Sequence, residues 1–180
     1  MSDQPRHRVF FAIWPDLNAR SHLVRLQDSL RSSVEARWVL PVNLHLTLAF
    51  VGPVAAERLQ VVREVAASTE AEPFSMWLDG LECWRSNRVL CLTPKQVPTT
   101  LNRLVETLAT GLDQAGFELD KRSYLPHLTL ARQSNCDQFG KEAAAAPIRF
   151  DAGAFHLVES RPSSLGPVYE TMESWVLGGG

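Results

Sequence analysis

The pentapeptide His-Leu-Thr-Leu-Ala occurs twice in this chain of 180 residues, once starting at His45 and once at His127, 82 positions later. Side chains alternate between the two faces of a strand, so His45 and Thr47 share one face while the leucines point to the other. His127 and Thr129 are arranged in the same way. The repeat therefore predicts two related strands, each of which presents an imidazole and a hydroxyl on the face opposite the core.

The segments that precede the two copies also recur in the same order. A short apolar run over residues 9–13 and a helical stripe over 17–31 precede the first copy. A run over 88–92 and a helical stripe over 99–116 precede the second. The first valine of the apolar run and the histidine are 36 positions apart in the first half, from Val9 to His45, and 38 in the second, from Val89 to His127. These intervals predict an internal duplication of a strand–helix–strand–helix–strand unit.

From this duplication we expect one α+β domain over residues 1–180, with two lobes related by a pseudo-twofold axis around a central cleft. The lobes would cover about 1–87 and 88–180, and strands can be exchanged between them. A hydrophobic content of 45% allows a sizeable core at this length.

Weaker patterns predict the remaining elements. We expect helices over 55–68 and within 137–146, and strands over 74–80, 87–93, 148–160 and 169–177. The first two of these strands should be joined around Ser86 and Asn87. Gly52 and Pro53 are expected to break the chain after the first histidine strand.

The net charge of −2 does not fit a protein that binds nucleic acid through general attraction to phosphates, so any phosphate site must be local. Of the 18 basic residues 15 are arginine, whose planar guanidinium matches phosphate best. No segment is long and apolar enough for a signal peptide or a membrane span. We therefore expect a cytoplasmic protein without membrane association.

The cysteines are Cys83, Cys91 and Cys136. Their odd number and the lack of CxxC spacing argue against a disulfide framework and against a thiolate zinc site. We expect all of them to be reduced thiols.

Two imidazoles that converge across a cleft can support three chemistries. A zinc site needs three or four protein ligands, and the repeat supplies only two. Nucleophilic catalysis through histidine is possible, although nothing in the motif orients one ring as a base for a serine or cysteine. General acid–base catalysis needs one neutral and one protonated imidazole, both of which exist near neutral pH. This last chemistry suits phosphodiester cleavage, although a single His-x-Thr pair is usually structural. The duplication favours the functional interpretation.

Paired His-x-Thr-x motifs, where x is apolar, resemble the signature of the 2H phosphoesterases. The chain is most similar to their RNA 2',3'-cyclic phosphodiesterase branch, also called 2'-5' RNA ligases. The segments RVFFAIWPD, NLHLTLAFVG, RSNRVLCL, PHLTLAR and SRPSSLGPVYETMESWVL extend the resemblance over nearly the whole chain. It implies a bilobal α+β fold with a water-filled cleft, no cofactor or metal, and hydrolysis of an RNA-terminal 2',3'-cyclic phosphate to a 2'-phosphate.

The resemblance also assigns roles to residues of the two motifs. His45 would be the proton donor to the leaving ribose 3' oxygen, and His127 the proton acceptor that activates water. Thr47 and Thr129 would bind the phosphate, and Arg132 would offset its charge.

The position of Arg132 and the aromatic residues of the site need further comment. Strict alternation puts Arg132 on the leucine face, so it reaches the cleft only if the strand ends or bulges near Ala131. Phe11, Trp38 and Tyr169 are candidates for stacking on the terminal base, although aromatic residues more often pack in a core.

Several alternatives stay open at this point. The same chemistry can act on a small nucleotide, such as ADP-ribose 1'',2''-cyclic phosphate or a 2'-5' oligoadenylate. Ligation of 2'-5' ends without ATP can be a side activity, because it reverses the hydrolysis with a 5'-hydroxyl in place of water. A protein of another class, an RNA-binding module without turnover, would retain the same cleft. We expect RNA 3' ends or nucleotide cyclic phosphates as partners, and a monomer.

Overall fold

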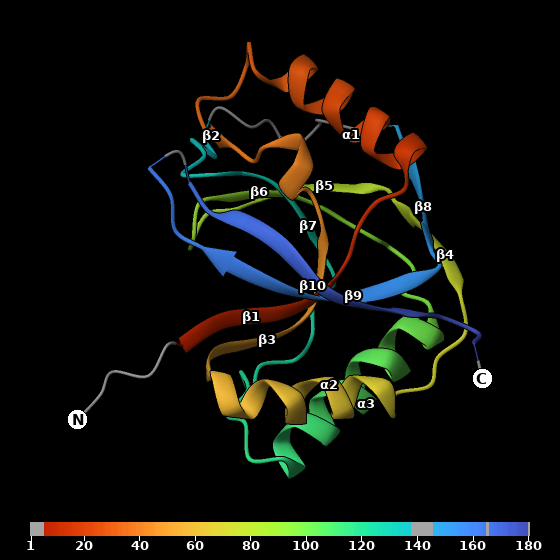
Figure 1. Cartoon of the computed structure of the whole chain (residues 1–180). Helices are drawn as coiled ribbons and strands as arrows, with labels where there is room; N and C mark the ends of the chain where they lie inside the picture. Colours follow the sequence, from red (N-terminus) through yellow and green to blue (C-terminus); the bar gives the residue numbers. More distant parts are fainter. Residues whose placement is uncertain (1–5, 138–145, 165, 180) are drawn as a thin grey trace.

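The computed structural model describes residues 6–137, 146–164 and 166–179, which form a mixed α/β fold (Figure 1). Its main element is an eight-stranded antiparallel sheet. The order in space is β10 (Val168–Val176), β9 (Ala154–Arg161), β1 (Arg6–Ile13), β3 (Leu46–Ala55), β7 (Leu128–Arg132), β6 (Val89–Thr93) and β5 (Gly80–Trp84). The eighth strand, β2 (Arg37–Trp38), pairs with β7. The predicted α+β class is confirmed.

The two strands that carry the pentapeptides, β3 and β7, meet at the centre of this sheet. Their register contains a single pair, Leu46 with Leu128, which are the second residues of the two pentapeptides. Antiparallel pairing of equivalent positions places a local twofold axis between these two buried leucines. Because the pairing extends no further, the sheet divides here into two halves: β3, β1, β9 and β10 on one side, and β7, β6, β5 and β2 on the other. Each half of the sheet takes strands from before and from after residue 87.

Three α-helices in the described part of the chain are α1 (Leu17–Leu30), α2 (Leu59–Ala67) and α3 (Thr99–Gln114). α2 and α3 lie together beneath β1 and β3, whereas α1 lies on the other side of the molecule (Figure 1). The carboxylate of Asp16 caps α1 by accepting a hydrogen bond from the backbone N–H of Ala19 at 2.8 Å. The predicted helices over 17–31, 55–68 and 99–116 are confirmed, although α2 begins later than expected. The helix predicted within 137–146 falls mostly outside the described residues.

The predicted break at Gly52 and Pro53 is wrong, because β3 continues to Ala55. Gly52 has a φ of +87°, and the bulge around it keeps the ladder to β1 intact. Pro53 is tolerated because β7 pairs with β3 only near Leu46, so no strand needs the missing N–H.

The predicted hairpin between 74–80 and 87–93 is also wrong in part. The partner of β6 is β5, whose sequence, Gly-Leu-Glu-Cys-Trp, has no clear strand pattern. The segment that was predicted, β4 (Phe74–Leu78), pairs instead with β8 (Ile148–Ala152) in a separate two-stranded sheet. This pairing joins the ends of the two duplicated units.

The expectation of three reduced cysteines is contradicted by a disulfide between Cys83 and Cys136. Cys83 lies in β5 and Cys136 follows β7, and these two strands flank β6. Their Cα atoms are 5.6 Å apart, a distance that suits a disulfide. Spacing along the sequence carried no sign of this long-range proximity. Cys91 is free and buried.

No helix in the described ranges is both long and apolar enough to cross a membrane.

Candidate active site

His45 and His127 lie on either side of the local twofold axis, each one residue before the paired leucine. Extending the register by one residue sets His45 beside Thr129 and His127 beside Thr47. All four side chains are half-buried, whereas the leucines between them are fully buried. The structure therefore brings the two predicted histidines and the two predicted threonines together on one face.

Both imidazoles are held in the same way by the backbone. Nδ1 of His45 donates to the carbonyl of Asn43 at 2.6 Å, and Nδ1 of His127 donates to the carbonyl of Leu125 at 2.8 Å. A carbonyl can only accept, so each Nδ1 carries the proton and each neutral Nε2 is an acceptor. The Nε2 of His45 is 3.0 Å from the hydroxyl of Thr47, which can donate to it. This tautomer is the one that leaves Nε2 available to exchange a proton with a ligand.

The ring of His45 is enclosed by aromatic side chains. The ring centroids of Phe10, Trp14 and Tyr169 lie 5.1, 5.6 and 5.3 Å from that of His45. The indole N–H of Trp14 donates to the hydroxyl of Thr171 at 3.1 Å, which fixes this ring in place. Strands β1 and β10 therefore supply an apolar wall around the first histidine.

In the part of the chain that the structure describes, the ring of His127 has one aromatic neighbour. The Trp84 ring lies 4.7 Å from it, centroid to centroid. The indole N–H of Trp84 donates to the Glu82 carboxylate at 2.7 Å, and the hydroxyl of Thr93 donates to the same carboxylate at 2.8 Å. These hydrogen bonds fix the Trp84 side chain, which comes from the edge strand β5, against the ring of His127.

Burial is the main cause of the low basicity of both histidines. It lowers the pKa of His45 from 6.5 to about 4, against the hydrogen bond to Asn43, which raises it. The charges of Arg132 and His127 lower the pKa of His45 further. Burial and then Arg132 also lower the pKa of His127, while the bond to Leu125 raises it. Both rings are therefore neutral at pH 7 in the free protein.

Arg132 reaches this face because β7 contains a bulge. Leu90 and Cys91 of β6 pair with Ala131 and Thr129, so Leu130 is an extra residue in β7. Leu130 and Ala131 are both buried, and the alternation of β7 is thereby reset so that Arg132 is exposed. Arg132 then lines a pocket together with His45 and Thr129.

A buried glutamine on α1 fixes the bulge. The side-chain amide of Gln27 donates to the carbonyl of Leu130 and to that of Val39, at 2.9 Å in each case. The side chain is fully buried. Gln27 thus ties α1 to β7 and to the residue after β2.

The pocket beside His45 is called the histidine pocket below. Its lining residues include Arg37, Trp38, Asn43, His45, Thr129, Arg132, Gly166, Pro167 and Tyr169. The side-chain amide of Asn43 donates to the carbonyl of Pro167 at 2.8 Å and so joins the loop before β10 to the first motif. Two of the predicted aromatic residues, Trp38 and Tyr169, therefore lie at the pocket.

The prediction that Phe11 stacks on a base is wrong. Phe11 is fully buried and packs against Phe155 and Trp175 in the core. Its neighbour Phe10 faces the histidine instead, as does Trp14. The period of two along β1 was the signal that separates these faces, whereas nothing local to β5 indicated Trp84.

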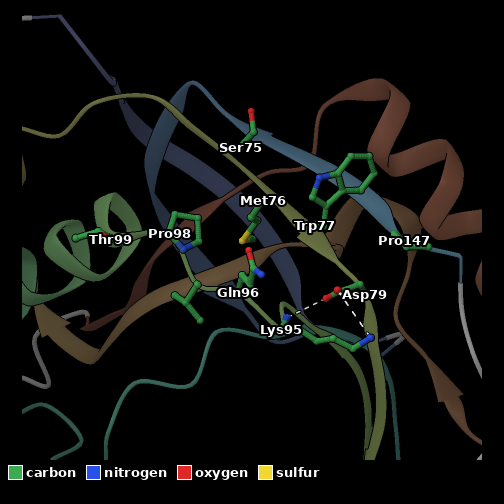
Figure 2. Close-up of a pocket in the computed structure, with 10 residues that line it drawn as sticks. Ser75, Met76, Trp77, Asp79, Lys95, Gln96, Pro98, Thr99 and Pro147 are labelled. Carbon is green, nitrogen blue, oxygen red and sulfur yellow. Dashed lines mark hydrogen bonds and ion pairs between the residues drawn. The ribbon is translucent and has the colours of Figure 1, made fainter.

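A larger hollow lies elsewhere, near the start of α3, and none of the motif residues line it (Figure 2). Its lining includes Asp79 and Lys95. One oxygen of Asp79 accepts from the backbone N–H of Lys95 at 2.8 Å, and the other lies 3.9 Å from its ammonium group. The two charges offset each other, so this hollow offers no free acid or base. Among the described residues no group of three His, Cys, Asp or Glu side chains is placed to hold a metal ion.

Comparison with known proteins agrees with the geometry of the histidine pair. The family model for the 2'-5' RNA ligase superfamily matches residues 14–163. The RNA 2',3'-cyclic phosphodiesterase of Bacillus subtilis (strain 168) is 35% identical over 134 residues, which cover 69% of this chain and 68% of that protein. The protein of the same name from Methanothermobacter thermautotrophicus is 30% identical over 179 residues, covering 92% of this chain and 96% of that protein.

A solved structure gives the same result for the fold. The crystal structure of E. coli LigT in apo form aligns with a TM-score of 0.84 at 26% identity, covering 97% of this chain and 99% of that one. Another structure of LigT, complexed with 3'-AMP, aligns with a TM-score of 0.80. The chain belongs to the 2'-5' RNA ligase superfamily of 2H phosphoesterases.

Proposed function

We propose that this protein hydrolyses the 2',3'-cyclic phosphate at RNA ends to a 2'-phosphate, with His45 and His127 as the acid–base pair. The observation that supports this most strongly is that both imidazoles anchor Nδ1 on a carbonyl and keep Nε2 available, on adjoining strands, beside two threonines. The relatives named RNA 2',3'-cyclic phosphodiesterase support the same activity. The protein is then an enzyme of the phosphoric diester hydrolase class.

In the proposed reaction, Nε2 of His127 takes a proton from water as the water oxygen bonds to phosphorus. The bond between phosphorus and the ribose 3' oxygen breaks, and His45 gives its proton to that oxygen. The phosphate stays on the 2' oxygen. Thr47, Thr129 and Arg132 hold the non-bridging oxygens, whose charge grows as the water attacks. Each proton transfer contributes about 10²- to 10⁴-fold in rate.

The acid role requires a proton on His45, whose pKa in the free protein is about 4. The bound cyclic phosphate carries a negative charge, which offsets Arg132 and raises the pKa of both imidazoles. Substrate binding therefore favours the protonated form of the acid. In the free enzyme the form with one proton on the pair is most abundant between the pKa of His45, about 4, and the pKa of His127, which burial holds below its usual 6.5. That proton lies mainly on His127, the more basic ring, and in the proposed reaction it has to lie on His45 once the substrate is bound.

These protonation states predict two different pH profiles. The profile of kcat/KM, which reports the free enzyme, should be bell-shaped with its maximum below pH 6.5, and that of kcat should peak at a higher pH. Both can be measured with an RNA oligonucleotide that ends in a cyclic phosphate, in EDTA, with the product identified as a 2'-phosphate by phosphorus NMR. A 3'-phosphate product, or activity lost in EDTA and restored by a divalent ion, would contradict the proposal.

Ligation of 2'-5' ends without ATP is proposed as a side activity of the same groups. In that reaction the 2',3'-cyclic phosphate is opened by a 5'-hydroxyl, which loses its proton to the base as water does in hydrolysis. The superfamily name supports this activity. It can be measured by incubating a cyclic-phosphate end with a 5'-hydroxyl end and looking for a linkage that resists ribonucleases specific for 3'-5' bonds.

A further inference from the structure

Two arginines face each other at the mouth of the histidine pocket. Arg37 of β2 and Arg132 of β7 are direct partners in the antiparallel ladder. The Cα atoms of such partners are about 5 Å apart, and like charges placed directly opposite destabilise a sheet. Within the described part of the chain, neither guanidinium makes an ion pair or a side-chain hydrogen bond. The lining of the histidine pocket contains no carboxylate. An anion is therefore the group that would relieve this repulsion.

The position of Arg37 depends on a glycine in the loop before β10. A Cβ atom on Gly166 would lie 2.8 Å from a terminal nitrogen of Arg37, so a side chain at this position would displace the guanidinium. Gly166 also has a φ of +115°, which side chains other than hydrogen rarely allow. The hydroxyl of Ser163 donates to the Gly166 carbonyl at 2.5 Å and closes the turn. The loop thus holds the Arg37 guanidinium at the pocket.

Arg37 lies beyond Arg132 as seen from the reacting phosphate. In the proposed reaction that phosphate contacts His45, Thr129 and Arg132, and Arg37 is one strand spacing, about 5 Å, further out. Trp38 and Tyr169 line the same pocket. A ligand that extends from the histidines towards Arg37 therefore needs a second anionic group.

A terminal nucleotide of RNA has such a group, the phosphodiester on its 5' side, whereas a cyclic mononucleotide does not. We propose that Arg37, seated on Gly166, binds the 5'-side phosphate of the terminal nucleotide and so makes the enzyme prefer RNA ends and 5'-phosphorylated nucleotides over unphosphorylated cyclic nucleotides. This assignment rests on the proposed function, because it takes the reacting phosphate to lie at the histidines. It makes Arg37 a residue that determines specificity.

The first test compares three substrates: adenosine 2',3'-cyclic phosphate, its 5'-phosphorylated form, and a dinucleotide that ends in a cyclic phosphate. Arg37→Ala should lower kcat/KM about 10- to 100-fold for the two substrates with a 5'-side phosphate, which is the effect of losing a charged hydrogen bond. It should leave adenosine 2',3'-cyclic phosphate unchanged within about twofold. Arg37→Lys should keep part of the preference, because the charge stays and the planar fork is lost. An equal loss on all three substrates, or no loss on any, would overturn the proposal.

The matched control removes a different exposed arginine. Arg103 lies on α3, is exposed, and is not among the lining residues of the histidine pocket. Arg103→Ala should leave all three values of kcat/KM unchanged, although it changes the net charge by the same amount. A loss equal to that of Arg37→Ala would show that the effect is one of overall charge only.

The second test does not depend on turnover. Adenosine 3',5'-bisphosphate should bind wild-type protein more tightly than adenosine 3'-monophosphate, and Arg37→Ala should weaken only the bisphosphate. For a single-stranded oligonucleotide, the slope of log Kd against log salt concentration should decrease by about 0.7 in the variant. If wild-type protein hydrolyses no cyclic phosphate, the proposed function fails and this binding comparison still tests Arg37. Equal binding of the two nucleotides to wild-type protein would refute the subsite.

Discussion

The His45 half and the His127 half of the site share their local geometry and differ in what surrounds it. Each imidazole donates Nδ1–H to the carbonyl two residues earlier and has a threonine two residues later. Among the residues that the structure describes, three aromatic rings pack around His45, whereas Trp84 alone packs on His127. The pKa of His45 falls to about 4, and that of His127 is lowered without reaching as large a shift. Duplication therefore supplies matched positions, and the neighbouring strands give the two rings unequal basicity.

This inequality has its origin in the two ends of the sheet. β9 and β10 extend the half that contains His45, and β10 contributes Tyr169 and Thr171 to the apolar wall. The half that contains His127 ends at β5, where Trp84 is held by Glu82. A symmetric pair of strands thus lies within an asymmetric sheet.

We expect the largest effect from replacing either histidine, and this experiment also tests whether the two have different roles. His45→Asn and His127→Asn should each lower kcat/KM by about 10²- to 10⁴-fold, because each removes one proton transfer. A substrate with sulfur in place of the 3' oxygen has a leaving group that needs no proton. Its use should restore most of the rate to His45→Asn and little to His127→Asn. The opposite pattern would reverse the assignment of acid and base, and equal rescue would remove the distinction.

The charge of Arg132 lowers the pKa of both histidines, so its removal should change both pKa values in the same direction. Arg132→Ala should lower kcat/KM by about 10²-fold, because a charged donor to the phosphate is lost. The same change removes a positive charge that lowers the pKa of His45 and of His127, so both pKa values should rise. Proton NMR titration of the free variant measures this, and the maximum of kcat/KM should move to higher pH. A shift of only one ring would show that Arg132 belongs to one half.

Gln27 holds only the His127 half, through the bulge of β7. Gln27→Leu leaves the Val39 carbonyl without its side-chain donor and weakens the bonding of the Leu130 carbonyl, which should cost about 1–3 kcal/mol of unfolding free energy. KM should rise more than kcat falls, because Thr129 and Arg132, which are proposed to bind the phosphate, lie on either side of Leu130 in β7. Thermal unfolding and steady-state kinetics measure the two effects. Gln60→Leu, on the exposed surface of α2, is the control and should change neither.

The smallest expected effect concerns the aromatic neighbours themselves. Trp84→Leu should raise the pKa of His127 towards its usual 6.5, because less of the ring is then buried. Tyr169→Leu should raise the pKa of His45 and leave that of His127 unchanged. The C2 proton resonances of the two imidazoles report both values. If each substitution moved both rings, the halves would be coupled through more than their shared strands.

Much of this arrangement follows from patterns within single elements. The helical stripes predict α1 and α3, and the repeated pentapeptide predicts two half-buried strands with the histidines on one face. The condition that Arg132 needs a bulge also follows from alternation alone. In each case the signal is the periodicity of apolar residues within one element. This periodicity is visible in the sequence because one face of the element packs against the core.

The parts that sequence did not predict depend on contacts between distant segments. One example is the strand β5, which forms by pairing with β6. Two others are the disulfide between Cys83 and Cys136 and the packing of Trp84 on His127, because each joins β5 to a residue next to β7. Alternation along β1 places Phe10 and Phe11 on opposite faces, but only the packing of Phe11 against Phe155 and Trp175 shows which face the core covers. The bulge at Leu130 likewise depends on β6.

The place of β10 affects how the enzyme is made. The first motif is translated early, but Asn43 bonds to Pro167, 124 positions later, and Tyr169 closes the wall around His45. Contacts so far apart in sequence form slowly and late, and domains fold only once their strands have been synthesised. A nascent chain that stops before Val168 contains both histidines yet lacks one side of the first. We therefore expect such a chain to be inactive, and catalysis to begin only once β10 has been synthesised and has paired with β9.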